Sequence, residues 1–129
     1  MLEPAVKELA EAPNFAVLTT LLPDGQPMSH VMWVGCDDDH LLINTEIHRA
    51  KFRNVERDPR VTVTIIDREN PYRFAEVRGE VVAKIRGPEA RASIDELSQK
   101  YGGRPYPDDA IQTERVILKI APRRQLSRG

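Results

Sequence analysis

Residues 15–36 have the sequence FAVLTTLLPDGQPMSHVMWVGC, and this stretch decides the fold class. Its first part, Phe15 to Leu22, is rich in the apolar and β-branched residues that favour strands. Pro23 to Gln26 has the composition of a tight turn, and Pro27 to Cys36 continues as a second, partner strand. The stretch therefore predicts a β-hairpin.

Further strands are predicted on the C-terminal side of this hairpin. The polar turn Asp37 to Asp39 leads into the apolar run Leu41 to Ile43, which predicts a three-stranded meander. Arg60 to Asp67 contains the β-branched run VTVTII, which is typical of a strand. Tyr72 to Ile85 alternates polar and apolar residues over a long strand, in which Gly79 would permit a bulge.

Three other segments have helical rather than alternating periodicity. They are Pro4 to Ala12, His48 to Val55 and the segment between Gly87 and Gly103. Glu114 to Pro122 alternates again and predicts a final strand. About six strands joined mostly by tight turns, with short helices inserted, favour a small antiparallel β-barrel that forms one domain over residues 1–129. Neither of the usual Gly-rich phosphate loops is present, which disfavours a Rossmann domain.

The composition excludes several classes of partner. The chain has 40% hydrophobic and 30% charged residues and a formal net charge of −1, so it has no overall field that would recruit nucleic acid. No window approaches the roughly 18 apolar residues of a membrane span, and Met1 to Ala12 does not resemble a signal peptide. We therefore expect a cytoplasmic protein that binds neither nucleic acid nor a membrane.

The single cysteine, Cys36, excludes an intrachain disulfide and is interpreted as a structural thiol. Cys36, His40 and His48 match no common zinc-ligand spacing, and no fourth ligand is evident. We predict no metal site.

The segment from Asn44 to Asn54, NTEIHRAKFRN, is the richest in chemistry. It leaves a strand and enters a helix, whose first backbone N–H groups attract anions. Thr45 adds a hydroxyl, while Arg49 and Lys51 add charges that can meet a phosphate. The alternative is a solvated basic helix face balanced by Glu46 and Glu56.

The order of these segments resembles the pyridoxamine 5′-phosphate oxidase-like superfamily, and especially its deazaflavin-dependent branch common in actinobacteria. After the hairpin, the likeness is carried by NTEIHRAKFRN (44–54), DPRVTVTII (58–66), YRFAEVRGEV (72–81), ELSQKYGG (96–103) and ERVILKIAP (114–122). It covers nearly the whole chain. The resemblance implies a mainly β, FMN-binding-protein-like split β-barrel that forms a homodimer, with the cofactor across the barrel at the dimer interface.

The resemblance also implies which residues bind the cofactor. The Thr and the Arg-x-Lys unit that hold its phosphate in the family match Thr45, Arg49 and Lys51, and residues 28–33 match the strand that lines its ring. Phe74 aligns where flavin oxidases of the superfamily often carry a ring-contacting glutamine. The predicted cofactor-binding residues are Ser29, His30, Met32, Trp33, Asn44, Thr45, Arg49, Ala50, Lys51 and Phe74.

Two of the ring-side candidates have other interpretations from the residues alone. Trp33 fits equally well as an anchor in the core or at a dimer interface, because large aromatic side chains mostly serve burial. His30 could donate to the ring or titrate near neutral pH, or it could only satisfy a nearby backbone carbonyl.

Departures from the family pattern bear on the cofactor. The missing glutamine at Phe74 weakens the case for FMN, and Ala121 to Leu126 lacks the arginine-containing motif that binds vitamin B6 substrates. We therefore expect the deazaflavin coenzyme F420, with FMN as the alternative. The acidic tail of coenzyme F420 requires further positive charge, for which Arg53, Arg57 and Arg60 are candidates unless they are ordinary surface charges.

The resulting hypothesis is an F420-dependent oxidoreductase that transfers a hydride to a small electron-poor substrate. The proton would come from solvent, or from His30 or Tyr72 if either lies close to the substrate. Loops Arg68 to Arg73 and Gly102 to Ala110 would shape the substrate pocket. The alternatives are a protein that binds or stores F420, FMN or haem without turnover, and an FMN-dependent oxidase; no catalytic residue is identified.

Overall fold

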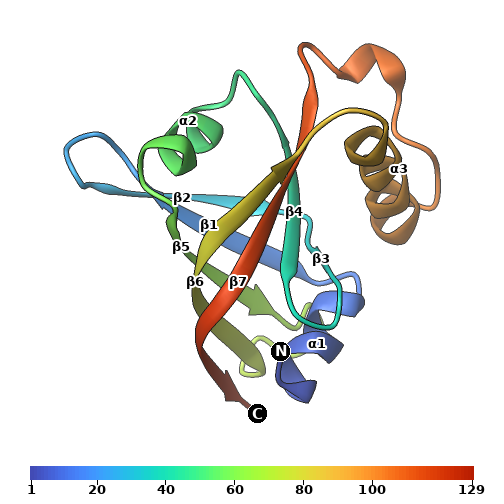
Figure 1. Cartoon of the computed structure of the whole chain (residues 1–129). Coiled ribbons are helices and arrows are strands. Elements are labelled where there is room, and N and C mark those ends of the chain that lie inside the picture. Colours follow the sequence, from blue (N-terminus) through green and yellow to red (C-terminus); the bar gives the residue numbers. More distant parts are fainter.

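The computed structural model describes all residues from Met1 to Gly129 (Figure 1). In chain order its elements are α1 (Pro4–Glu11), β1 (Phe15–Leu21), β2 (Pro27–Met32), β3 (Gly35–Cys36), β4 (Leu41–Glu46), α2 (Ala50–Arg57), β5 (Arg60–Ile66), β6 (Phe74–Ile85), α3 (Pro88–Gly102), the 3-10 turn η1 (Asp108–Ala110) and β7 (Arg115–Arg128). None of the helices is both long and apolar enough to cross a membrane.

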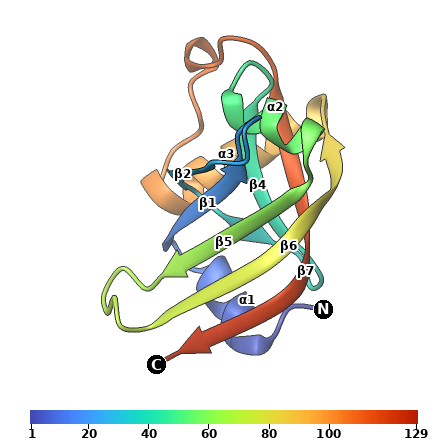
Figure 2. The same ribbon diagram turned by 90° about the vertical axis from the view of Figure 1, so that its left-hand side faces the viewer.

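The strands form one curled antiparallel sheet in the order β2-β1-β5-β6-β7-β4-β3. Helix α1 lies at the end of the sheet where both termini are found, and α2 and α3 lie at the other end (Figures 1 and 2). The prediction of a mainly β split barrel is confirmed. The hairpin of β1 and β2 is present, and its register pairs Leu21 with Pro27 across the turn.

The predicted three-stranded meander is wrong. The chain leaves the sheet at Trp33 and Val34, so that β2 lies at one edge of the sheet and β3 at the other. Strand β3 pairs only with β4, through Gly35 with Leu42 and Cys36 with Leu41. The apolar run from Pro27 to Cys36 hid this crossing because residues at both of its ends have strand propensity.

The inner face of the sheet encloses the core. A cluster of 20 buried residues includes Leu18, Ile43, Val63 and Leu118 from four strands. Helix α1 contributes Val6 and Leu9, and α2 contributes Phe52 and Val55. In β1 and β5, which the apolar and β-branched composition predicted as strands, every second side chain is buried.

Strands β6 and β7 are the longest pair, and their register shifts between Arg78 and Gly79, as the sequence predicts for Gly79. A Cβ atom at Gly79 would lie 2.3 Å from the Ala121 carbonyl oxygen. This irregularity explains why β7 continues to Arg128 instead of ending at Pro122. Pro122 lies opposite Gly79 at the shift, where a regular ladder is interrupted and the missing N–H of proline is tolerated.

Other element boundaries differ by a few residues. Helix α2 begins at Ala50 rather than at His48. Strand β6 begins at Phe74 rather than Tyr72, because the loop before it closes through a hydrogen bond from the Asp67 N–H to the Arg73 carbonyl. Strand β4 extends three residues beyond the predicted Ile43, which places Asn44 and Thr45 within the strand.

Candidate functional site

A pocket of about 440 Å³ lies where the two edges of the sheet separate. Its lining comes from β1, β2, β4, the start of α2, α3, the loop after α3, and β7, together with Trp33. Trp33 and Val34 lie between β2 and β3, and we call them the crossing segment. The lining residues are Phe15, Val31, Met32, Trp33, Asn44, Thr45, Arg49, Lys51, Ile94, Tyr106 and Arg115. We call it the split pocket.

Unpaired strand edges border the split pocket. Strand β2 pairs only with β1, and β3 covers β4 only at Leu41 and Leu42. The edge of β4 from Asn44 to Glu46 therefore has no strand partner on the side away from β7. Backbone N–H and C=O groups at such edges are available to a ligand.

Lys51 is the most informative side chain of the split pocket. It is only 8% exposed, yet its ammonium group makes no hydrogen bond or ion pair with the rest of the chain. Burial and the nearby charges of Arg49 and Arg115 lower the pKa of Lys51. A cation that is largely removed from water and has no counter-charge in the chain is stabilised by an anion, so this end of the pocket is suited to an anionic ligand.

Thr45 and Arg49 accompany Lys51 at this end. Thr45 is a buried residue whose hydroxyl makes no hydrogen bond within the chain, and the exposed Arg49 side chain has no carboxylate partner. The alternative of a balanced basic face fails for Lys51 and Arg49, because Glu46 is bound to Gln112, Thr113 and Arg115 instead. The residues predicted to bind a phosphate therefore converge and are free to do so.

Helix α2 is fixed against β1 by polar contacts, and this orients Lys51. The buried Asn54 amide donates to the Thr20 hydroxyl at 3.0 Å and accepts from the Arg57 guanidinium at 2.9 Å. Arg57 also donates to the Leu21 carbonyl at 2.6 Å. Because residues three or four apart share a helix face, Asn54 and Lys51 both point towards the barrel.

Aromatic side chains form the other end of the split pocket. Trp33 stacks on Tyr101 with ring centroids 5.2 Å apart and planes at 8°, and Tyr106 meets Trp33 edge-on at 6.4 Å. The ring centroids of Phe15 and Tyr101 are 5.9 Å apart. Planar, apolar walls of this kind are suited to a conjugated ring.

The crossing segment that carries Trp33 is held by α3. The Tyr101 hydroxyl donates to the Asn14 carbonyl and accepts from the Val34 N–H at 3.1 Å. The Lys100 ammonium donates to the carbonyls of Ala10 and Val34. Hydrogen bonds from these side chains replace the backbone hydrogen bonds to a neighbouring strand that the crossing segment lacks.

Sequence reasoning missed several residues of the split pocket, of which Tyr106 and Arg115 carry polar groups. Arg115 donates from Nε to the Asn44 side-chain oxygen at 2.7 Å and lies 5.2 Å above the Tyr106 ring. A charged residue directly before the apolar run Val116 to Leu118 was the available signal for Arg115. Tyr106 lies in the predicted substrate loop between two prolines, and only the fold shows that its ring enters the pocket.

The split pocket gathers some of the predicted residues and not others. It contains Met32, Trp33, Asn44, Thr45, Arg49 and Lys51. Ala50 begins α2 between the two basic residues without lining the pocket. Ser29, His30 and Phe74 lie outside it; the Ser29 hydroxyl is 2.7 Å from that of Thr19, and Phe74 pairs with Ile66 on the outer face of the sheet.

The two candidate proton donors also lie outside the split pocket of a single chain. His30 is exposed on the edge strand β2, and Tyr72 is 86% exposed in the loop before β6. No group of three or more His, Cys, Asp or Glu side chains is arranged to hold a metal ion.

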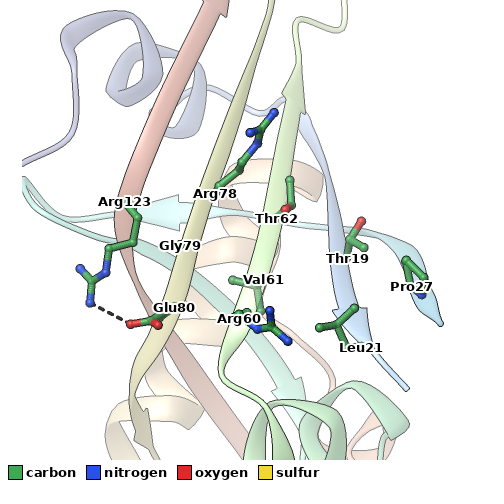
Figure 3. Close-up of a pocket in the computed structure, with 10 residues that line it drawn as sticks. All are labelled: Thr19, Leu21, Pro27, Arg60, Val61, Thr62, Arg78, Gly79, Glu80 and Arg123. Carbon is green, nitrogen blue, oxygen red and sulfur yellow. Dashed lines mark hydrogen bonds and ion pairs between the residues drawn. The ribbon is translucent and has the colours of Figure 1, made fainter. Parts of the chain in front are cut away.

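A second hollow, of about 420 Å³, lies on the outer face of β1, β5, β6 and β7 (Figure 3). We call it the outer hollow. Arg60, Arg78 and Arg123 line it, and each has a carboxylate partner, namely Asp58 at 2.7 Å, Glu76 at 2.9 Å and Glu80 at 3.0 Å. Hydrogen bonds from Arg60 lower the pKa of Asp58 to about 2.

The three arginines considered for an acidic tail therefore differ. Arg60 is paired with Asp58 and belongs to the outer hollow. Arg53 and Arg57 donate to the carbonyls of His48 and Leu21 and have no carboxylate partner, so their charges remain uncompensated.

The chain is similar to known proteins over nearly its whole length. The family model described as pyridoxamine 5′-phosphate oxidase matches residues 2–127. A solved F420 reductase is 33% identical, with a TM-score of 0.83, over 97% of this chain and 98% of that chain. A conserved hypothetical protein from Mycobacterium tuberculosis is 29% identical, with a TM-score of 0.76, over 99% of this chain and 84% of that chain.

More distant structures show the same fold. General stress protein 26 from Bacillus anthracis is 19% identical, with a TM-score of 0.72, over 96% of this chain and 91% of that chain. No curated protein sequence matches this chain.

Proposed function

Because this chain belongs to the pyridoxamine 5′-phosphate oxidase family, we propose that it is an oxidoreductase that uses the deazaflavin coenzyme F420 to reduce a small electron-poor organic molecule. The F420 reductase that it resembles supports the choice of cofactor. The single observation that carries the proposal is the buried, unpartnered Lys51 beside Thr45 and Arg49.

The residues present fit a phosphate-bearing ring cofactor. Lys51, Arg49 and the Thr45 hydroxyl would hold the phosphate, because charge-assisted hydrogen bonds from Lys and Arg are the strong ones. Met32, Trp33 and the free edges of β2 and β4 would receive the ring. Arg53 and Arg57, which have no carboxylate partner, remain the candidates for the acidic tail.

When bound, a reduced deazaflavin supplies a hydride to an electron-poor substrate. The chain would contribute position and environment. Trp33, Tyr106 and Ile94 would exclude water from one side of the ring, and the cations would fix its opposite end. The proton would come from solvent, since a single chain brings neither His30 nor Tyr72 into the split pocket.

We also propose that the protein is a homodimer that buries the outer face of β1 and β2. Val31 is 66% exposed there and Phe15 is 42% exposed, and both also line the split pocket. A second copy over this face would close the pocket and remove exposed apolar surface from water. Ser29 and Phe74 lie on the same outer face, so they would reach a cofactor only in such a dimer.

The test is a fluorescence titration of the apoprotein with coenzyme F420 and, separately, with FMN. Trp33 is the only tryptophan of the chain and lines the split pocket, so its emission reports directly on this site. Binding of coenzyme F420 in preference to FMN, followed by oxidation of reduced F420 in the presence of an enone or quinone, is the expected result.

Each other outcome identifies a different function. A preference for FMN with oxygen consumption would make the protein a flavin oxidase. Binding without turnover of any substrate would make it a cofactor-binding or storage protein. Binding of neither cofactor would refute the proposal, and a monomer in light scattering would refute the dimer.

A further inference from the structure

The split pocket has two cationic lobes on different sides of strand β4. Side chains alternate along a strand, so Thr45 points with Leu41 and Ile43 towards the core while Asn44 and Glu46 point the other way. Thr45, Arg49 and Lys51 form one lobe at the start of α2. Asn44, Ile94, Tyr106 and Arg115 form the other beside α3, which we call the α3 lobe.

The α3 lobe is built around Arg115. Its side chain is only 11% exposed. Its Nε donates to the Asn44 oxygen at 2.7 Å, and the Asn44 amide in turn donates to the Ala90 carbonyl of α3 at 2.9 Å. One face of the guanidinium covers the Tyr106 ring at 5.2 Å. The side chain is therefore held in one orientation by contacts on several sides.

Most of the donors of Arg115 remain unused. A guanidinium has five N–H groups in a planar fork. Only the Nε group and one terminal nitrogen of Arg115 donate within the chain, the latter to Glu46 at 3.3 Å. The free outer edge of the fork has the geometry that binds a carboxylate through two parallel hydrogen bonds.

Glu46 does not neutralise Arg115 fully. One of its oxygens accepts from the Gln112 N–H at 2.8 Å, the Thr113 N–H at 2.8 Å and the Thr113 hydroxyl at 3.2 Å. Only the other oxygen contacts Arg115, at a distance longer than the roughly 2.7–2.9 Å of a strong charge-assisted bond. Glu46 thus ties Arg115 to the loop before β7 and acts as a positioning residue.

We propose that the α3 lobe binds the carboxylate of a planar conjugated acid, with Arg115 as the carboxylate-binding group and Glu46 as its positioning residue. The aromatic rings of Trp33 and Tyr106 and the apolar Ile94 select a flat apolar body for this acid. The identification of the acid as the substrate rests on the proposed function, whereas its binding by Arg115 does not.

The experiment uses the apoprotein and two probes, 2-naphthoate and inorganic phosphate, observed by two-dimensional ¹H–¹⁵N NMR. The single indole N–H, from Trp33, and the Nε–H of Arg115 report on the α3 lobe. A ligand of this size should bind with a dissociation constant on the order of 1 mM. The neutral 2-naphthamide should bind at least about tenfold more weakly than 2-naphthoate, because it lacks the charge that Arg115 recognises.

Two variants should give a crossed pattern. Arg115→Gln should weaken the binding of 2-naphthoate about 10- to 100-fold and the binding of phosphate less than about threefold. Lys51→Gln should weaken the binding of phosphate more than that of 2-naphthoate. Arg86→Gln is the matched control, because it removes the same charge from a side chain outside the split pocket. It should change neither affinity.

Glu46→Gln separates positioning from simple electrostatics by the sign of its effect. The amide keeps an oxygen for the loop N–H groups and loses the acceptor for Arg115. If Glu46 only repelled anions, its removal would tighten 2-naphthoate binding; if it positions Arg115, binding should weaken about threefold or more and the Arg115 Nε signal should broaden.

The proposal is overturned if 2-naphthamide binds as tightly as 2-naphthoate, or if Arg115→Gln weakens both probes equally. The first comparison uses only the wild-type protein, so it stands even if a variant fails to fold. Since no cofactor is present, failure of coenzyme F420 to bind would leave these results unchanged.

Discussion

The split pocket and the outer hollow are similar in size, and each is lined by three basic side chains. They differ in whether these side chains have carboxylate partners. In the outer hollow every arginine has a carboxylate partner within about 3 Å, and Figure 3 shows the pair of Arg123 with Glu80. In the split pocket Lys51 and Arg49 have none, and Arg115 has one contact at 3.3 Å. The lack of carboxylate partners, rather than the number of cations, distinguishes a candidate ligand site from an ordinary charged surface.

The two regions also differ in how their backbone is held. The outer hollow lies on four strands that pair continuously, from β1 through β5 and β6 to β7. The split pocket lies between unpaired edges, and side chains from α3 hold the segment that crosses between them. The largest effect on stability is therefore expected in the first region, and the largest effect on binding in the second.

The largest effect on stability is expected at Gly79, beneath the outer hollow. In Gly79→Ala the new methyl group would lie 2.3 Å from the Ala121 carbonyl oxygen, so the β6–β7 ladder must shift. We expect a loss of about 3 kcal/mol in the free energy of unfolding, measured by urea denaturation. Gly102→Ala is the control, because a methyl group there meets nothing within 4 Å. Equal stability of both variants would show that the shift costs nothing.

The next effect concerns binding at Lys51. Lys51→Met removes the charge and keeps a side chain of similar length, and it should weaken binding of a phosphate-bearing cofactor by about 1.5–3 kcal/mol, measured by Trp33 fluorescence. Unchanged affinity would remove the central claim about the split pocket.

The lowered pKa of Lys51 predicts that the free energy of unfolding depends on pH, and Lys51→Met is the comparison. The pKa of Lys51 is lowered by burial and by Arg49 and Arg115, so between the folded pKa and the unfolded value near 10.5 the unfolded chain binds more protons. Wild-type apoprotein should therefore gain stability relative to Lys51→Met as pH rises through this window. Parallel stability curves in thermal unfolding from pH 7 to 10 would contradict it.

A smaller effect is expected where side chains replace the backbone ladder. Tyr101→Phe removes the hydroxyl that joins Asn14 to Val34 and should cost about 1–2 kcal/mol in unfolding free energy. It should also shift the Trp33 emission, because the crossing segment is held less firmly. Tyr72→Phe is the control, since Tyr72 is 86% exposed. An unchanged free energy of unfolding and an unchanged Trp33 emission in Tyr101→Phe would mean that Lys100 alone holds this segment.

The smallest effect is expected at Arg123. Arg123→Gln removes a half-exposed arginine paired with Glu80, and cofactor affinity should change less than about twofold. A selective loss of affinity for coenzyme F420 but not for FMN would show instead that the outer hollow meets the acidic tail.

Much of the fold could be predicted because its signals are local. Apolar and β-branched composition predicts β1 and β5, the turn after β1 predicts β2 as the partner of β1, alternation predicts β6, and Gly79 predicts the bulge. The separation of β2 from β3 could not be predicted, because it depends on which strands pair across the sheet. The same reason explains the unforeseen end of β7, which continues only because β6 lies beside it.

The candidate site divides in the same way. Thr45, Arg49 and Lys51 come from one continuous segment, so the sequence alone determined that these groups lie together at the start of a helix. Only the tertiary structure decided that Lys51 lacks a partner, that Arg115 and Tyr106 join it, and that Ser29, His30 and Phe74 lie outside the split pocket. The physical reason is that burial and charge compensation depend on neighbours distant in sequence, whereas residue spacing within one helix or strand depends only on backbone geometry.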